Sequence, residues 1–162
     1  MSIRLEGDVQ KLKRKLQYLS SLDRKGINAT IAEAVRSSTR QRFKRQTSPE
    51  GKRWQPSIRA QEEGGVTLSD SGRLKNSIRA KSDASGAAVG TNVIYASTHQ
   101  LGAQGRTIRA KTAKGLVFRV GGRWVRAKAV RVTIPARSFL GLSEDDMEEI
   151  KATMEAALAK EG

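Results

Sequence analysis

The stretch NVIYASTHQLGA, residues 92–103, contains His99, which is the only histidine of the 162-residue chain. Histidine is the side chain most often used as a general acid or base near neutral pH. A zinc site would need further ligands, yet the chain has no second histidine and no cysteine. A serine triad would need a distant serine and aspartate, and no local signature marks them. We therefore predict that His99 is structural.

The residues around His99 predict a short helix. It should end at Gly102, because glycine is common just past the last turn of a helix. Tyr95 and His99 are four residues apart, so they should lie on one face of that helix. We expect the His99 side chain to hydrogen-bond a neighbouring loop or a neighbouring subunit.

Other enzymatic motifs are missing from the sequence. It has no phosphate-binding glycine loop, no nucleophile elbow and no HExxH motif. Glu50 and Asp70 could form a glycosidase carboxylate pair, but nothing marks them as one. We predict a protein that is not an enzyme and binds no metal or cofactor. No apolar run approaches the ~20 residues that span a bilayer, and the N-terminus lacks the apolar core of a signal peptide, so we expect a cytoplasmic product without a membrane partner.

Charge is distributed unevenly along the chain. Lys and Arg number 31 against 16 Asp and Glu, which gives a net charge of +15. No acidic residue lies between Ala84 and Ser143, whereas ten Lys or Arg lie from Arg106 to Arg137. The acidic residues gather in SEDDMEEI, residues 143–150. A basic zone implies an anionic partner, which includes the acidic end of another copy. The same acidic cluster could equally do no more than cap a helix.

The stretch LVFRVGGRWVRA, residues 116–127, predicts a β-hairpin that turns at its two glycines. This register pairs Phe118 with Val125 and Arg119 with Trp124, and the face that carries Phe118 should be buried. The opposite face, with Arg119, Trp124 and Arg126, could bind phosphates and stack on a base. The alternative is a solvated arm that keeps the protein soluble. The candidate contact residues on the arm and in the acidic turn are Arg119, Arg123, Trp124, Arg126, Lys128, Arg131, Glu144, Asp145 and Asp146.

Hydrophobic spacing predicts one α+β domain over residues 1–162. Two helices, from about Gly7 to Ser21 and from Ile27 to near Phe43, should form an N-terminal helical hairpin within residues 1–44. Residues 45–142 should form a small, mostly antiparallel β-sheet with a short central helix before Ile78 and an extended basic β-hairpin arm over residues 105–134. We expect Trp54 to anchor the first loop of this region on the core.

The C-terminal segment, residues 143–160, carries clear helix signals. Ser143 is a good N-cap, and acidic residues fill the first turn, where the helix dipole favours them. We expect this helix to pack on the sheet. Its predicted docking face is the apolar stripe of Met147, Ile150, Met154 and Leu158.

Several motifs, in order, resemble the phage virion morphogenesis family, the tail completion or neck proteins of long-tailed bacteriophages, including Mu-like phages. They are Phe43, SPEGKRW, LSDSGRLKNSI, VGTNVIYASTHQLG and IPARSFLGLSEDD, and they span the chain from Phe43 to the C-terminal helix. In the last motif we expect Pro135 to end a strand and Arg137 to bind a carbonyl or an acid. The residues that we take as structural landmarks of the motifs are Trp54, Gly72, Leu74, Tyr95, His99, Gly102, Pro135, Arg137 and Phe139.

This resemblance implies a structural virion protein without catalytic residues. It would act as a homo-oligomeric ring, most simply a hexamer, at the top of the tail. Its partners would be the tail tube or tail terminator and the head-closure or connector proteins, with genomic DNA in the channel as a further contact. It would be made in the host cytoplasm and stay in the neck of the virion. The alternative is a free-standing basic module that binds nucleic acid, with steeply salt-dependent affinity.

Overall fold

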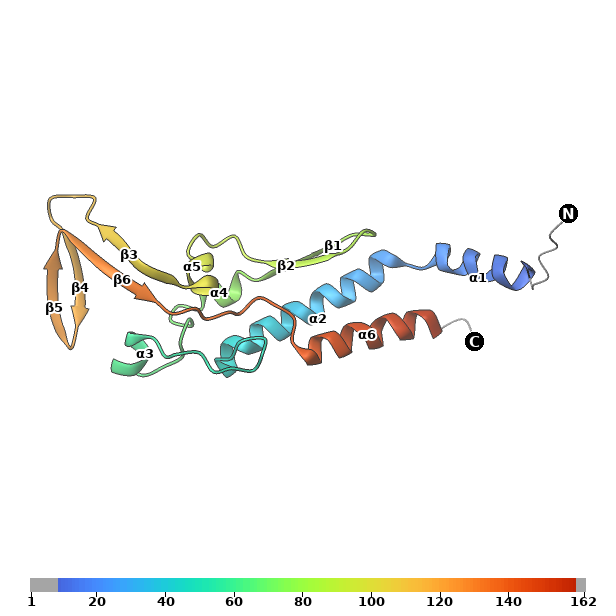
Figure 1. Cartoon of the computed structure of the whole chain (residues 1–162), viewed down its shortest axis with the longest axis horizontal. Helices are drawn as coiled ribbons and strands as arrows, with labels where there is room; N and C mark the ends of the chain where they lie inside the picture. Colours follow the sequence, from blue (N-terminus) through green and yellow to red (C-terminus); the bar gives the residue numbers. More distant parts are fainter. Residues whose placement is uncertain (1–8, 160–162) are drawn as a thin grey trace, which may run out of the picture.

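The computed structural model describes residues 9–159, which form a long, narrow molecule (Figure 1). Helices occupy the middle and one end, and paired strands form the other end. The elements are, in chain order, α1 (Val9–Ser21), α2 (Arg24–Arg45), α3 (Ile58–Glu62), α4 (Arg73–Asn76), β1 (Arg79–Ser82), β2 (Ala87–Gly90), α5 (Ala96–Leu101), β3 (Ala103–Arg109), β4 (Leu116–Val120), β5 (Arg123–Ala127), β6 (Ala129–Ile134) and α6 (Glu144–Ala159). The predicted α+β class is confirmed.

The two N-terminal helices do not fold back on each other, so the predicted helical hairpin is wrong. Only Leu22 and Asp23 separate them, and Asp23 caps α2 by accepting a hydrogen bond from the Gly26 N–H at 2.9 Å. Helix α1 instead continues beyond the start of α2 (Figure 1). The reason lies in α2, whose sides are already covered by the β1–β2 pair and by α6. The predicted start of the first helix at Gly7 lies outside the described residues.

The strands form three separate antiparallel pairs where the sequence predicted one small sheet. These pairs are β1–β2, β3–β6 and β4–β5. The antiparallel prediction is confirmed, and so is the short helix before Ile78, which is α4 followed by β1. Each pair is too small to bury two faces, so the core forms where α2 and the connecting loops pack together.

Helix α6 packs on α2 and not on a sheet, and it does so with a face that the sequence did not predict. Asp146 is buried, and Ile150, Thr153 and Ala157 are half-buried at helical spacing behind it. The carboxylate of Asp146 pairs with Arg42 of α2, and this contact sets the rotation of the helix. Of the predicted docking stripe, only Ile150 therefore faces the body, and the exposed members are Met147, Met154 and Leu158.

The core gathers aromatic and aliphatic side chains from distant parts of the chain. Phe43 lies at its centre, with its ring 5.6 Å from Trp54 in an edge-to-face contact and 5.2 Å from Phe139. The indole N–H of Trp54 donates to the Ser138 carbonyl at 3.0 Å. The predicted anchoring of Trp54 on the core is thus confirmed, and the motif landmark Phe139 is buried beside it. The buried apolar residues of this cluster are Phe43, Trp54, Leu74, Ile78, Ala96 and Phe139.

Candidate assembly surfaces

A buried ion pair joins α2 to α6. The guanidinium of Arg42 pairs with Asp146 and also donates to the carbonyls of Phe139 at 3.1 Å and Gly141 at 2.7 Å. Asp146 in turn accepts from the Ser143 N–H at 2.8 Å, and the Ser143 hydroxyl accepts from the Asp146 N–H at 3.2 Å, which confirms Ser143 as the helix cap. Asp146 is therefore not available to a partner, contrary to its prediction as a contact residue.

Hydrogen bonds offset the desolvation cost of burying the Asp146 carboxylate. Burial by itself raises the pKa of Asp146, but hydrogen bonds from Ser143 and Ser38 and the charge of Arg42 outweigh it and hold the pKa below the ordinary 3.8. Sequence reasoning missed Arg42. The available signal was its place one residue before Phe43 on the inner face of α2, where Ala32 and Thr39 are also buried.

The IPARSFLG motif is fixed by hydrogen bonds to backbone atoms. Strand β6 ends at Ile134, directly before Pro135, as predicted. Arg137 donates through Nε to the Gln55 carbonyl at 2.7 Å, which confirms the predicted bond to a carbonyl. The Gln100 side chain, which sequence reasoning missed, accepts from the N–H groups of Phe139 and Leu140, each at 3.0 Å. This motif therefore tethers the base of the arm to the core.

His99 lies on α5 beside Tyr95, and the two rings meet edge to face at 5.9 Å. The shared face and the end of the helix at Gly102 are as predicted. The side-chain hydrogen bond to a neighbouring loop is not found, because the buried Nδ1 has no partner among residues 9–159, and the alternative bond to a neighbouring subunit stays a prediction. Burial, and then the charge of Arg137, lower the pKa of His99 below 6.5, so the ring is neutral at pH 7.

The landmarks Gly72 and Leu74 lie at and near the start of α4 and have structural roles. Gly72 precedes α4 in a left-handed conformation with φ of 71°, and Leu74 is buried in the core. A shallow pocket of about 300 Å³ lies between these residues and His99. Within residues 9–159, no three His, Asp or Glu side chains are grouped as metal ligands would be.

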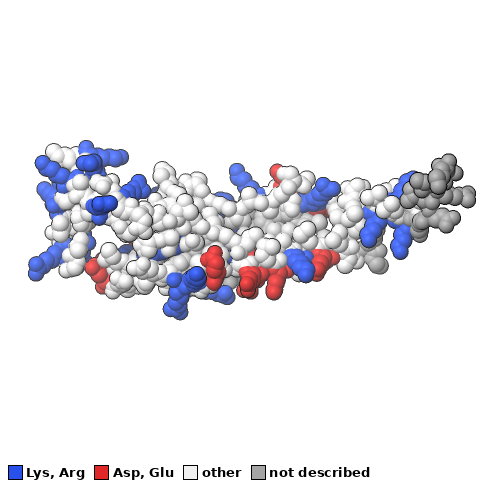
Figure 2. Space-filling model, in the orientation of Figure 1, with Lys and Arg blue, Asp and Glu red and all other residues white. Residues whose placement is uncertain are grey.

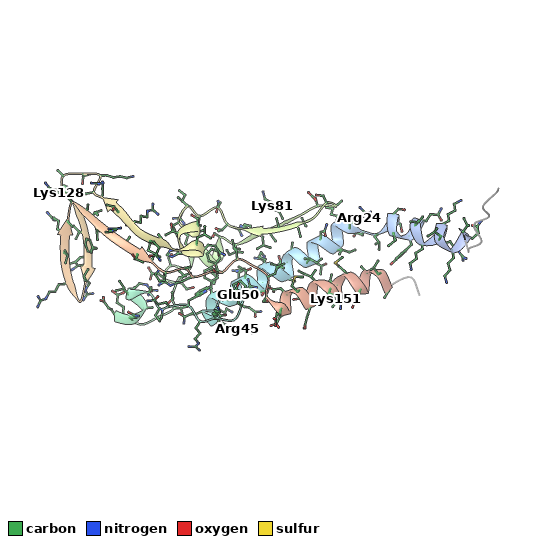
Figure 3. The ribbon with its side chains drawn as sticks, viewed as in Figure 1. Arg24, Arg45, Glu50, Lys81, Lys128 and Lys151 are labelled. Carbon is green, nitrogen blue, oxygen red and sulfur yellow. The ribbon has the colours of Figure 1, made fainter. Side chains whose placement is uncertain are left out.

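The basic arm consists of a stem and a tip. The stem is the β3–β6 pair, and the tip is the β4–β5 hairpin, which lies across the end of the molecule (Figure 1). The predicted register of the tip is confirmed, with Phe118 opposite Val125 and Arg119 opposite Trp124. Lys128 sits at the corner between β5 and β6, as Figure 3 shows. At the base of the stem, Arg106 donates to the Thr98 hydroxyl at 3.2 Å.

The two faces of the tip are both open to solvent. Phe118 is half-buried, but Val120 and Val125 are exposed, so the predicted burial of that face is wrong for its outer part. A single hairpin has no second layer to cover it. On the opposite face Trp124 is 74% exposed. Arg119 approaches Glu63, beyond α3, at 3.8 Å, and this is the one ion pair found for the tip within the described residues.

Charges of opposite sign occupy different parts of the molecule. Figure 2 shows Lys and Arg over the arm, a strip of Asp and Glu over α6, and Lys and Arg again over α1. Glu144 and Asp145, which were predicted as contacts, are exposed at the start of α6. Lys151, on the same helix, lies far along the molecule from Lys128 (Figure 3). The molecule therefore offers a basic arm and an acidic helix as separate surfaces.

The sequence was compared with models of known protein families. The model of the phage virion morphogenesis family matches residues 6–159, which is nearly the whole chain. The chain belongs to the phage virion morphogenesis family. This match confirms the resemblance seen in the ordered motifs. The matched residues also include the N-terminal helices and the arm. No curated protein and no solved structure matches the chain. No helix within residues 9–159 is long and apolar enough to cross a membrane.

Proposed function

We propose that this member of the phage virion morphogenesis family is a structural, non-enzymatic tail completion protein. It caps the tail as a homo-oligomeric ring, most simply a hexamer, and joins the tail to the head connector. Family membership supports a part in virion assembly. The ordered motifs from Phe43 to the C-terminal helix resemble those of tail completion proteins. Its partners are then the tail tube or tail terminator on one side and the head-closure or connector proteins on the other.

The observation that carries the proposal is the arm. It leaves the body through a stem anchored by Arg106 and Arg137, and its tip exposes Trp124 between cationic side chains. An exposed tryptophan bordered by arginines is typical of the centre of a protein interface. Because the tip carries no acidic residue, it fits an acidic surface on a neighbouring virion protein.

A charge reversal in the arm tests this function. In a phage that lacks its own copy of the gene, we supply the triple variant Arg119→Glu, Arg123→Glu and Arg126→Glu from a plasmid. Heads and tails should then accumulate unjoined in electron micrographs, while the purified variant keeps the circular dichroism of the parent. The matched control reverses three exposed basic residues of the body, Lys44, Arg45 and Lys52. Infectious particles at normal yield from the arm variant would refute the function proposed for the arm.

The second candidate function, nucleic-acid binding, has one observation in its favour. On the exposed face of the tip, Trp124 is flanked by Arg119 directly across the hairpin and by Arg126 on the same strand, which is how a stacking platform for single-stranded DNA is built. Affinity for DNA that falls steeply with salt and is lost in Trp124→Ala would favour this function. Joining of heads to tails by that same variant at normal yield would favour it further.

A further inference from the structure

Helix α1 presents an apolar face that nothing within residues 9–159 covers. The apolar residues recur at helical spacing, and none of the helix is buried. Leu12 and Leu16 at its centre are 59% and 57% exposed. A helix of 13 residues is marginal in water by itself, so it needs a packing partner to be stable. The exposed stripe consists of Val9, Leu12, Leu16 and Leu19.

Helix α6 presents a second exposed apolar strip. Because Asp146 turns toward Arg42, the side chains of Met147, Met154 and Leu158 are displaced to the flank of the helix. Met154 and Leu158 are 51% and 46% exposed. Methionine is a flexible side chain that adapts to a docked surface.

The two helices carry opposite charges. Between Val9 and Ser21 there are four basic residues and no acidic residue, whereas α6 has six acidic residues and one lysine. Helical geometry places Lys13 and Lys15 on either side of the α1 stripe. The same geometry places Glu144 and Glu155 on one side of the exposed strip of α6, and it places Lys151, which pairs with Glu155 at 3.9 Å, between Met147 and Met154. The α1 stripe therefore has basic residues at both borders, and the α6 strip has a mainly acidic border on its solvent side, so the two surfaces carry net charges of opposite sign.

The chain's own α6 is out of reach of the α1 stripe. The Tyr18 hydroxyl donates to the Ala157 carbonyl at 2.6 Å, so α1 meets α6 only where both helices end. From that point α1 leads away past the end of α6 (Figure 1). Within residues 9–159 the stripe is therefore open to a second molecule.

We propose that α1 of one copy packs along the exposed strip of α6 of the next copy. Their lengths agree, because 13 and 16 residues at ~1.5 Å each give about 20 and 24 Å. Pairing α1 with α1 or α6 with α6 would bring like charges together, so the contact joins two different surfaces. A repeated contact of this heterologous kind closes into a ring when its rotation allows. The inference deepens the proposed ring and rests on that part of the proposed function. It also leaves the arm free for other virion proteins.

The test uses the purified full-length chain and measures its mass by light scattering across a range of concentrations. One variant carries Leu12→Gln with Leu16→Gln, and another carries Met154→Gln with Leu158→Gln. Each should lower the association constant by about tenfold or more, since two large apolar side chains lose their burial. The matched control replaces Ile94 and Leu101 with Gln, because these are exposed apolar residues on a different part of the surface.

Mixing the two variants tests the direction of the contact. Each variant alone has one intact surface of the pair and should be mainly monomeric at concentrations at which the parent assembles. An equimolar mixture should yield a dimer and nothing larger, because only one productive α1–α6 contact remains possible. A mixture that stays monomeric, or parent-sized assemblies from either variant alone, would overturn the proposal.

A charge exchange and a vesicle assay complete the test. Lys13→Glu with Lys15→Glu should prevent assembly, and adding Glu144→Lys with Glu155→Lys to the same chain should restore it. If α1 instead binds membranes, the leucine variant will lose binding to phosphatidylserine vesicles while its assembly is unchanged, and the proposal fails. Rings that form as described but do not join heads to tails would contradict the proposed function and leave the α1–α6 contact standing.

Discussion

The buried pair between Arg42 and Asp146 gives the sharpest prediction for stability. Both residues are almost fully buried, with 5% and 3% of their surfaces exposed. Asp146→Asn keeps the size of the side chain and one accepting oxygen but removes its charge. The guanidinium of Arg42 would then stay buried with only neutral partners, the carbonyls of Phe139 and Gly141 and the Ser38 hydroxyl.

Removing one partner of a buried ion pair costs about 3–5 kcal/mol. Because the neutral hydrogen bonds of Arg42 remain, we expect the lower end, about 3 kcal/mol, out of a total stability of about 5–15 kcal/mol. For a chain of this size, 1 kcal/mol shifts the melting temperature by about 2–4 °C, so the variant should melt about 6–12 °C lower. Urea unfolding followed by circular dichroism measures the same loss as a free energy.

The control for this experiment is Asp145→Asn, which removes the same charge one residue earlier. Asp145 is exposed, so its substitution should change stability by no more than about 0.5 kcal/mol. The argument from burial would be refuted if the two variants were equally stable.

The pH dependence provides a second measurement on the same variant. The pKa of Asp146 is lower in the folded chain than its ordinary value, so near that value the unfolded chain binds a proton that the folded chain does not. The pair therefore contributes its full stabilisation above about pH 5, and it loses this stabilisation as the pH falls through 3.8 and below. The stability difference between the parent and Asp146→Asn should be constant from pH 8 to about 5 and then shrink.

Two further substitutions, His99→Gln and Gly102→Ala, test the buried neutral ring of His99 and the close backbone contact at Gly102. The folded chain holds the pKa of His99 below 6.5, so the parent should lose stability as the pH falls through and below that value. Thermal melts at pH 7.5 and 5.5 should show this loss in the parent and not in His99→Gln. Identical pH profiles for the two proteins would contradict the prediction. Gly102 and Gly51 have φ of 76° and 77°, but a Cβ on Gly102 would lie 2.9 Å from the backbone of Ala136 and Ile134, whereas one on Gly51 meets nothing within 4 Å. Gly51→Ala should cost only about 1–2 kcal/mol of backbone strain, and Gly102→Ala should destabilise the chain clearly more. Equal losses of stability would show that the close approach of residue 102 to the backbone of Ala136 and Ile134 is unimportant.

The parts of the candidate surfaces that the sequence predicted correctly all depend on neighbours along the chain. The two glycines at residues 121–122 fix the turn and hence the pairing of Phe118 with Val125. Ser143 caps α6 through a residue three positions later, and Pro135 ends β6 because it has no N–H to donate. Each of these outcomes needs only a few consecutive residues.

The errors have a common origin in contacts between distant segments. Arg42 and Asp146 are separated by 104 positions, and no local pattern reveals that they meet. Their contact rotates α6, so the helix docks through Ile150 and its neighbours and turns Met154 to the solvent. The predicted helical hairpin failed for a related reason, since α2 was already covered on both sides.

By itself, the sequence determined the types and approximate ends of most elements, though not of α3, together with the register of the basic hairpin and the family motifs, because propensity, capping and turn chemistry act over a few residues. The tertiary structure decided which face of each helix is buried, how the strands divide into separate pairs, and that the His99 ring has no hydrogen-bond partner within the described chain. Those outcomes depend on which distant side chains compete for the same buried space. That competition left the apolar stripe of α1 and the flank of α6 exposed, and these are the surfaces through which we propose that copies of the chain meet.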